Sequence, residues 1–260
     1  IETNYFAELI ADPVAGNMIR TLFVNKGSAD KLRARPEGFE KTKINTLGML
    51  GAGMMGSGIT LVSARSGMNV VLLDSTEEQA ARGKQYTEKF LEKRVKKGKM
   101  TTEAAAEVLD RITVTTDFND LAECDLIIEA VFENREIKAD VTQKTEAVIS
   151  EETVFASNTS TLPITGLAES SSRPEGFIGM HFFSPVERMP LVEIILGKET
   201  SDRALAAALD YVQQIRKTPI VVNDSRGFFT SRVFSTACNE ANTMLMEGVS
   251  PALIENAARH

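Results

Sequence analysis

Two side chains near the middle of the chain have the chemistry of a general base and its partner. His181 closes the apolar stretch GFIGMHFF, and Glu193 follows in the next apolar run, twelve residues later. Histidine titrates near neutral pH, and a neighbouring carboxylate fixes its tautomer and stabilises the imidazolium formed when a hydroxyl proton is removed. The spacing leaves enough chain for a turn and a return strand. The pair therefore predicts a catalytic base, and the alternative is a purely structural His–Glu hydrogen bond.

A second group of residues has the spacing of a dinucleotide site. The strand-like INTLGML runs into Gly51-x-Gly53-x-x-Gly56, a helical stretch follows, and the next strand-like run ends at Asp74. Gly51 permits the tight turn, Gly53 lets the backbone approach a pyrophosphate, and Gly56 allows close packing of helix and strand. Asp74 is placed to accept hydrogen bonds from an adenosine ribose. Because Ser75 follows and no arginine is close in sequence, we expect NAD rather than NADP.

A polar cluster follows the strand-like TVFAS, and its members are Ser157, Asn158, Thr159, Ser160 and Thr161. Such residues often cap helices or form turns, and a helix could begin near Pro163. Capping explains one or two of them. Five in a row at the end of a strand predict a hydrogen-bonding surface that faces cofactor and substrate.

Glu133 and Lys138 follow another strand-like run, DLIIEAV, and invite a similar interpretation. On charge alone, the simpler expectation for both is a solvated face.

The elements that position these residues alternate between strand-like and helix-like patterns from Ile44 to Asp224. This alternation predicts an α/β fold, a Rossmann-like doubly wound and mainly parallel sheet. We expect a linker helix and connecting segment over 1–43, a NAD-binding domain over 44–224, and the start of a truncated helical domain over 225–260. The expected strands are INTLGML, NVVLLD, ITVTT, DLIIEAV, TVFAS, GFIGMHFF, PLVEIIL and IVVND; the expected helices include 6–32, 76–97, 137–150 and 228–248.

Composition narrows the possible partners. The 260 residues carry a net charge of −7, which argues against a nucleic-acid surface, and no run of eighteen apolar residues suggests a membrane span. Cys124 and Cys238 have neither disulfide-framework nor metal-ligand spacing, so we expect no metal site and a reducing compartment.

Six segments together resemble the 3-hydroxyacyl-CoA dehydrogenase family: GAGMMGSGI, LLD, IIEAVFENREIK, FASNTSTLPI, GMHFFSPVERMPLVEII and TPIVVNDSRGFFTSRV. The resemblance covers residues 44–247 in collinear order and is closest to the dehydrogenase part of multifunctional fatty-acid-oxidation enzymes. It implies that the segment before Ile44 is the helix that joins an enoyl-CoA hydratase part to the dehydrogenase, with the hydratase part absent from this chain.

The resemblance also implies roles for individual residues. His181 matches the family's catalytic base, Glu193 its orienting partner, and Ser160 the serine that contacts both substrate and nicotinamide. Ser184 and Ser231 stand where many members have asparagine, so their contacts to the nicotinamide amide and the substrate carbonyl are expected to be remodelled or water-mediated. The positions that match NAD-contacting residues are Met55, Asp74, Val131, Phe132, Glu133 and Lys138.

The implied activity is NAD-dependent oxidation of L-3-hydroxyacyl-CoA to 3-ketoacyl-CoA in fatty-acid beta-oxidation. Two alternatives are a dehydrogenase for another 3-hydroxy acid without CoA, and a non-catalytic NAD-binding or assembly module of a larger enzyme. The implied partners are an acyl-CoA substrate, an oligomer formed through missing segments, and a thiolase subunit. A bacterial cytoplasm is favoured over an organelle.

The end of the chain carries one more expectation. The family has a helical domain that closes over the acyl-CoA, so we expect this chain by itself to bind NAD but to turn over slowly. The long helix after Gly227 is expected to leave an apolar face uncovered. That face consists of Phe228, Phe229, Val233, Phe234, Met244 and Leu245.

Overall fold

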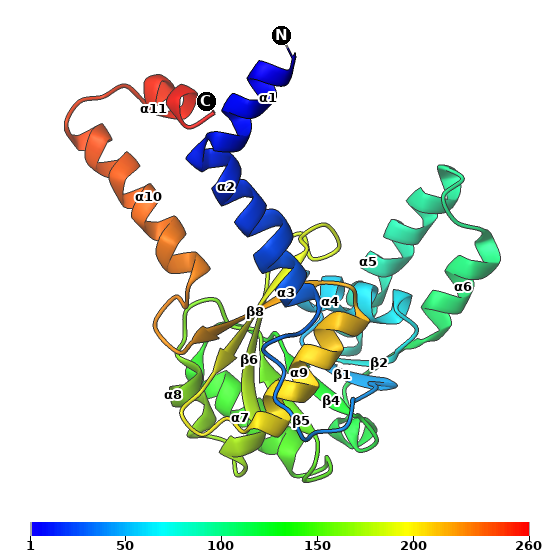
Figure 1. The fold of residues 1–260 in the computed structure, drawn as a ribbon. Coiled ribbons are helices and arrows are strands. Elements are labelled where there is room, and N and C mark those ends of the chain that lie inside the picture. Colours follow the sequence, from blue (N-terminus) through cyan, green and yellow to red (C-terminus); the bar gives the residue numbers. More distant parts are fainter. Residues whose placement is uncertain (1, 260) are drawn as a thin grey trace.

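The computed structural model describes residues 2–259 and builds them around one eight-stranded sheet (Figure 1). Ile1, the first residue of the predicted segment 1–43, and His260, the last residue of the predicted segment 225–260, lie outside the described residues. The strand order is β3-β2-β1-β4-β5-β6-β7-β8, and neighbouring strands are parallel except β6 and β7. The bounds are β1 Thr46–Leu50, β2 Asn69–Leu73, β3 Ile112–Thr115, β4 Leu126–Glu129, β5 Val154–Ser157, β6 Phe177–Phe182, β7 Leu191–Leu196 and β8 Thr218–Asn223.

All eight predicted strands are confirmed, and with them the doubly wound α/β fold. Strands covered on both faces read as continuous apolar runs, which is why β4, β5 and β6 are buried along their whole lengths. Helix α4 (Met54–Arg65) lies against β1 and β2, while α9 (Asp202–Gln214) lies across β6, β7 and β8 on the same side. Helices α7 (Arg135–Glu146) and α8 (Ile164–Ala168) cover the opposite face.

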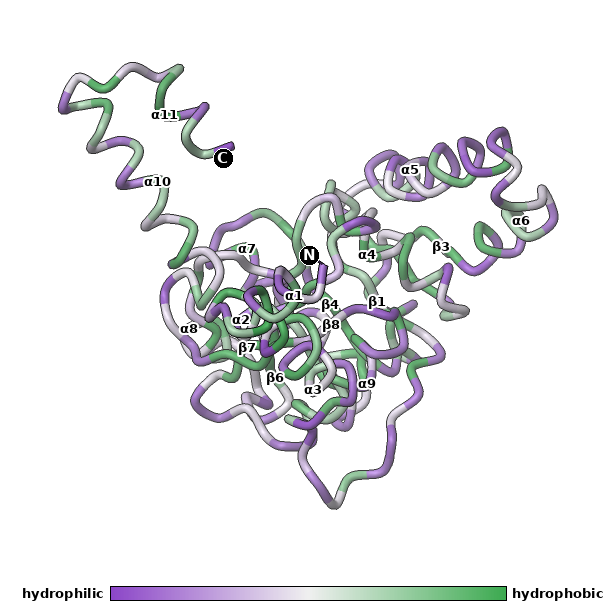
Figure 2. The backbone as a smooth tube through the Cα atoms, turned by 45° about the horizontal axis from the view of Figure 1, so that its top comes forward, coloured by the Kyte–Doolittle hydropathy of each residue, from purple (hydrophilic) through white to green (hydrophobic). Residues whose placement is uncertain are grey.

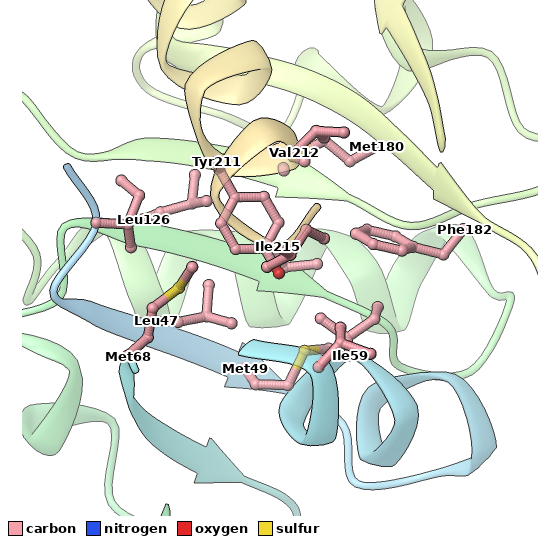
Figure 3. Close-up of a cluster of buried hydrophobic side chains, with 14 of the residues drawn as sticks. Leu47, Met49, Ile59, Met68, Leu126, Met180, Phe182, Tyr211, Val212 and Ile215 are labelled. Carbon is pink, nitrogen blue, oxygen red and sulfur yellow. The ribbon is translucent and has the colours of Figure 1, made fainter. Parts of the chain in front are cut away.

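The larger apolar core lies between the sheet and the layer formed by α4 and α9. Figure 3 shows Tyr211 among side chains from β1, α4 and α9, including Met49 and Ile215. The Tyr211 hydroxyl lies 2.8 Å from Ser63 Oγ, so its polar atom is satisfied inside the core. This packing joins the two halves of the sheet behind the site.

A helical hairpin that the sequence patterns only partly predicted extends from the sheet edge near β3. Helix α5 (Glu77–Lys96) was expected, whereas α6 (Thr102–Asp110) was not. Thr101 caps α6 by accepting the backbone N–H of Ala104. The remaining short elements are the 3₁₀ turns η2 (Phe118–Leu121) and η3 (Pro174–Gly176).

The N-terminal helix projects from the sheet and consists of consecutive pieces (Figure 1). They are α1 (Glu2–Ala11), α2 (Pro13–Ile19), the π-helical η1 (Arg20–Asn25) and α3 (Lys26–Asp30). The break falls at Asp12, whose side chain caps α2 before Pro13. The connecting segment is fastened to α9, because Arg35 makes two hydrogen bonds of 2.8 and 2.9 Å to the carboxylate of Asp210.

The C-terminal helices also extend away from the sheet, as Figure 2 shows. They are α10 (Thr230–Met246) and α11 (Pro251–Ala257). The predicted apolar face is exposed at Phe229, Val233, Phe234, Met244 and Leu245. The expectation for Phe228 was wrong: its side chain is only 2% exposed, because the chain turns before α10 and places the ring in the smaller core cluster. Among residues 2–259, no helix combines the length and apolar character needed to cross a bilayer.

Candidate active site

The turn from β1 into α4 has a backbone that only glycine allows. Gly51 has a φ of +95°, and a Cβ there would lie 2.7 Å from the carbonyl oxygen of Ala130. A Cβ on Gly56 would lie 1.8 Å from the carbonyl oxygen of Gly51. Gly53, in contrast, has open space beside it, and no side chain caps the first turn of α4. The free N–H groups of this helix start therefore suit a pyrophosphate.

A cleft of about 980 Å³ lies along this turn and the ends of β1, β2 and β4. Its wall includes Gly51, Gly53, Met55, Asp74, Val131 and Phe132, all of them residues that the sequence predicted to contact the cofactor. These residues are brought together as expected. The cleft has the glycine turn, the helix start and the acidic residue that a dinucleotide requires.

Asp74 lines the cleft but already has backbone partners. It accepts the N–H groups of Ala52 and Ser75, each at 2.6 Å, and remains partly exposed. The sequence showed no arginine close to Asp74, yet the fold brings Arg82 to the same cleft wall. Arg82 is paired with Glu78 at 2.7 Å.

A second cavity of about 360 Å³ adjoins the first. The two cavities share Met55, Ala130 and Val131 in their walls, so they are neighbours at the carboxyl ends of the strands. The predicted residues that line the second cavity include Glu133, Asn158, Ser160, His181 and Ser184, and Phe183 joins them. The second cavity therefore collects the predicted substrate-side residues next to the cofactor cleft.

His181 and Glu193 are direct partners across the antiparallel pair β6 and β7. Nδ1 of His181 lies 2.7 Å from Oε2 of Glu193, and the side chain of Glu193 is fully buried. Because an ionised carboxylate only accepts, Nδ1 carries the proton and Nε2 is the nitrogen left for a ligand. The rings of Phe183 and Phe228 lie 4.5 and 6.0 Å from the imidazole. The predicted return strand and contact are confirmed.

Glu193 is held in its charged form by several donors. Burial alone raises the pKa of its carboxyl group, but the hydrogen bonds from His181 and Thr230 outweigh burial and bring that pKa below its ordinary value. Oε1 accepts the backbone N–H groups of Phe229 and Thr230 at 3.2 and 2.9 Å. Oε2 accepts the hydroxyl of Thr230 at 2.8 Å as well as His181.

A second buried carboxylate, Glu129, lies beneath the loop that separates the two cavities. Its Oε1 accepts from Lys138 Nζ and from the backbone N–H of Val131, both at 2.7 Å, and its Oε2 accepts from Ser157 at 2.7 Å. Lys138 is only 2% exposed and lines neither cavity. The solvated-face alternative is therefore wrong for Lys138. Lys138 Nζ also lies 3.3 Å from Glu133, which reaches the second cavity.

The polar cluster after β5 divides between two tasks. Asn158 and Ser160 line the second cavity, as expected. Ser157 and Thr159 are buried, so the expectation of one continuous surface was wrong for these two. Thr159 bonds Glu133 and accepts the N–H groups of Thr161 and Leu162, which is the turn-forming role that the capping alternative described.

The remaining predicted residues lie in or behind the walls of the two cavities. Ser231 lies at the start of α10, and its hydroxyl donates to the carbonyl oxygen of Ser160 at 3.5 Å. Ser184 follows β6 and contacts the sulfur of Met54 at 3.7 Å. Neither cavity is lined by Gly56, Lys138, Glu193 or Ser231.

Sequence reasoning missed two residues of this site. Glu129 was included in the strand-like run DLIIEAV without a role of its own. A carboxylate inside an apolar run was a usable signal, because a charge in a buried strand needs a partner. Thr230 lies in a helix start that was expected to present an apolar face. Its contact to Glu193 spans 37 residues, and no local pattern announces it.

No group of three or more His, Cys, Asp or Glu side chains with the geometry of a metal site occurs within residues 2–259. Both cysteines are free, and burial raises the pKa of the Cys124 thiol to about 12, so this side chain packs as an apolar group.

Comparison with known proteins places this geometry among dehydrogenases. A sequence model described as "3-hydroxyacyl-CoA dehydrogenase, NAD binding domain" matches residues 46–225. A probable 3-hydroxybutyryl-CoA dehydrogenase from Deinococcus radiodurans is 46% identical over 203 residues, which are 78% of this chain and 73% of the relative. The crystal structure of (S)-3-hydroxybutyryl-CoA dehydrogenase from Ralstonia eutropha superposes with a TM-score of 0.81 at 38% identity, covering 84% of this chain and 79% of that one.

A longer relative matches almost the whole chain. The fatty acid oxidation complex subunit alpha from Psychrobacter arcticus is 38% identical over 255 residues, which are 98% of this chain. The chain spans only 35% of the length of that relative.

Proposed function

Because the chain belongs to the 3-hydroxyacyl-CoA dehydrogenase family, we propose that it oxidises L-3-hydroxyacyl-CoA to 3-ketoacyl-CoA in fatty-acid beta-oxidation, with His181 as general base. The family makes it an NAD-dependent oxidoreductase. The observation that carries the proposal is the His181–Glu193 pair, whose imidazole lines a cavity next to the cofactor cleft.

The residues of the cleft fit NAD. The open space at Gly53 and the uncapped start of α4 would receive the pyrophosphate, and Asp74 would accept from the adenosine ribose. Met55 and Val131 would contact the nicotinamide end, where the two cavities meet, and Phe132 would contact the cofactor from the wall of the first cavity. When bound there, NAD supplies the acceptor for the hydride that leaves C3 of the substrate.

The substrate side is built from side chains. His181 removes the proton of the 3-hydroxyl through Nε2, and the charge that develops on the imidazole is stabilised by Glu193 through Nδ1–H. Ser160, which lines the second cavity, and Ser231, whose hydroxyl contacts the carbonyl oxygen of Ser160, hold the oxygen that becomes the ketone. Ser184 faces the same cavity and orients the nicotinamide amide. Lys138 and Glu133 act through the loop between the cavities.

The direct test is oxidation of L-3-hydroxybutyryl-CoA with NAD, followed as the appearance of NADH absorbance. We expect turnover with the L-substrate, none with its D-isomer, and none with free 3-hydroxybutyrate. Longer L-3-hydroxyacyl-CoA substrates would then define the chain-length range. Turnover of free 3-hydroxybutyrate would favour the CoA-independent alternative. NAD binding without any turnover of an L-3-hydroxyacyl-CoA would favour a non-catalytic module.

The match to the fatty acid oxidation complex subunit alpha supports a place in a larger assembly. We propose that residues 44–224 are the NAD-binding unit, that 1–43 form a linker, that 225–260 begin a helical domain, and that a thiolase subunit is among the partners. The exposed apolar side chains of α1 and α10 support this, since such surfaces are usually covered. Limited proteolysis that left a stable core of about 44–224 would agree with these boundaries.

A further inference from the structure

The start of α10 is tied to the catalytic carboxylate by three separate hydrogen bonds. Oε1 of Glu193 accepts the backbone N–H groups of Phe229 and Thr230, and Oε2 accepts the hydroxyl of Thr230. His181 is the fourth donor, and it shares Oε2 with that hydroxyl. Glu193 thus serves two elements at once, the imidazole and the first turn of a 17-residue helix.

We propose that Thr230 is a positioning residue that sets the proton affinity of the His181–Glu193 pair and couples it to the place of α10. The proposal rests on the function proposed above. Each donor to Glu193 stabilises its negative charge, and the free N–H groups of a helix start add a partial positive charge. The hydrogen bonds from Thr230 are among the causes that bring the pKa of Glu193 below its ordinary value.

Oε2 of Glu193 has two donors, His181 and the Thr230 hydroxyl. Two donors that share one oxygen atom each interact with only part of the negative charge of that oxygen. Removing the Thr230 hydroxyl leaves Oε2 to His181 alone, so the pair takes up a proton more readily and therefore at a higher pH. His181 must be free of its second proton to accept one from the substrate. Activity is therefore lost at a higher pH when the solution is acidified.

The other charged groups near this pair have their own partners. Glu133, on the wall of the second cavity, is paired with Lys138 at 3.3 Å. On α10, Arg232 donates to Ser225 at 3.3 Å. Asp224, after β8, accepts the first N–H groups of α8 at 2.9 and 2.8 Å. The register partner of Glu193 on β8 is the apolar Ile220. A change at Thr230 leaves these contacts in place.

The test compares Thr230→Val with Thr230→Ser, which keeps the hydroxyl, and with Thr236→Val as a matched control. Thr236 lies on the same helix and donates to the carbonyl oxygen of Arg232, away from the site. In Thr230→Val, we expect the acid limb of the kcat/KM profile to move to higher pH by about one unit, from the size of a hydrogen bond to a charged group. NAD affinity should stay unchanged, and both other variants should follow the parent protein.

A readout without turnover separates this proposal from the proposed function. The chain has only two histidines, so the Nδ1 proton of His181 can be assigned by NMR. We expect that resonance to move further downfield in Thr230→Val, because Oε2 then has one donor fewer. Thr230→Ala gives the same measurement if the valine variant does not fold. An unshifted resonance in folded Thr230→Val or Thr230→Ala, with the acid limb unmoved, overturns the proposal, whereas an inactive parent protein overturns only the proposed function.

Discussion

Glu129 and Glu193 are two buried carboxylates in the same sheet, and they have opposite surroundings. Each lies 2.7 Å from a basic side chain and is at most 1% exposed. The partner of Glu129 is Lys138, which is buried and lines neither cavity. The partner of Glu193 is His181, whose ring borders the second cavity. The first pair therefore holds a loop, whereas the second can exchange a proton with a ligand.

The two pairs differ in whether the basic side chain keeps a nitrogen atom available for a ligand. The ammonium group of Lys138 contacts two carboxylates inside the protein, those of Glu129 and Glu133. His181 gives one ring nitrogen to Glu193 and keeps the other, and histidine changes charge near neutral pH.

His181→Ala should lower kcat by about a hundredfold to ten-thousandfold, the usual contribution of a general base. NAD affinity should stay almost unchanged, because His181 lies outside the cofactor cleft. Steady-state kinetics and calorimetric titration with NAD check both parts. If the variant keeps near-parental turnover, the pair is structural, as the alternative interpretation held, and the contrast with Glu129 disappears.

Glu129→Ala should lower the free energy of unfolding by about 3–5 kcal/mol, because it leaves the Lys138 charge buried without its main partner. Urea unfolding measures the change. The double variant Glu129→Ala, Lys138→Met should recover part of the loss, since no buried charge remains. As an exposed control, Glu78→Ala removes a surface partner of Arg82 and should cost less than about 1 kcal/mol. Equal losses at Glu129 and Glu78 would contradict a supporting role for the first pair.

Glu193→Gln should reduce kcat less than His181→Ala does, by about 10- to 100-fold, since it removes a charge-assisted hydrogen bond but keeps the base. Steady-state kinetics with both variants give this ranking. A larger loss than in His181→Ala would mean that the carboxylate does more than orient and stabilise the imidazole.

The same variant has a pH signature in stability. The folded protein depresses the pKa of Glu193, so its charge contributes stability above the unfolded value of about 4.3 and loses it as pH falls through the lower folded value. The stability difference between the parent protein and Glu193→Gln should therefore be largest at neutral pH and shrink on acidification. Urea unfolding at several pH values measures it, and a difference that grows toward acid pH would reverse the assignment.

Asp74→Ala should have the smallest effect, about a tenfold weaker affinity for NAD together with reduced discrimination against NADP. Asp74 follows β2 and is partly exposed, and its carboxylate accepts backbone N–H groups, so it differs from both buried pairs. Asp74→Asn is the matched control, because its amide oxygen can still accept the N–H of Ala52 without carrying charge. Calorimetric titration with both cofactors gives the ratio. If the parent protein already binds NADP as tightly as NAD, Asp74 has no ribose role.

Local patterns were sufficient for the sheet and the cofactor turn. Apolar and β-branched runs of strand length, separated by helical periods, identify strands, and all eight were found in this way, including the less buried β3 and β8. The turn at Gly51 was equally readable, because its left-handed backbone and close approach to Ala130 restrict the position to glycine. Helix α6 was not predicted, because its short sequence, TEAAAEVLD, follows closely on a longer helix.

The strands, most of the helices, their order and the residue types available for chemistry can be predicted from the sequence, since each depends on neighbours within a few positions of the chain. Tertiary folding places Glu193 opposite His181 in register, brings Lys138 and Ser157 to Glu129, and turns Phe228 inward. The fold also brought Thr230 to Glu193 across 37 residues. Such contacts are set by strand pairing and by the direction in which α10 leaves the sheet. Burial then selects among them, because a charge removed from water persists only where the fold supplies a partner.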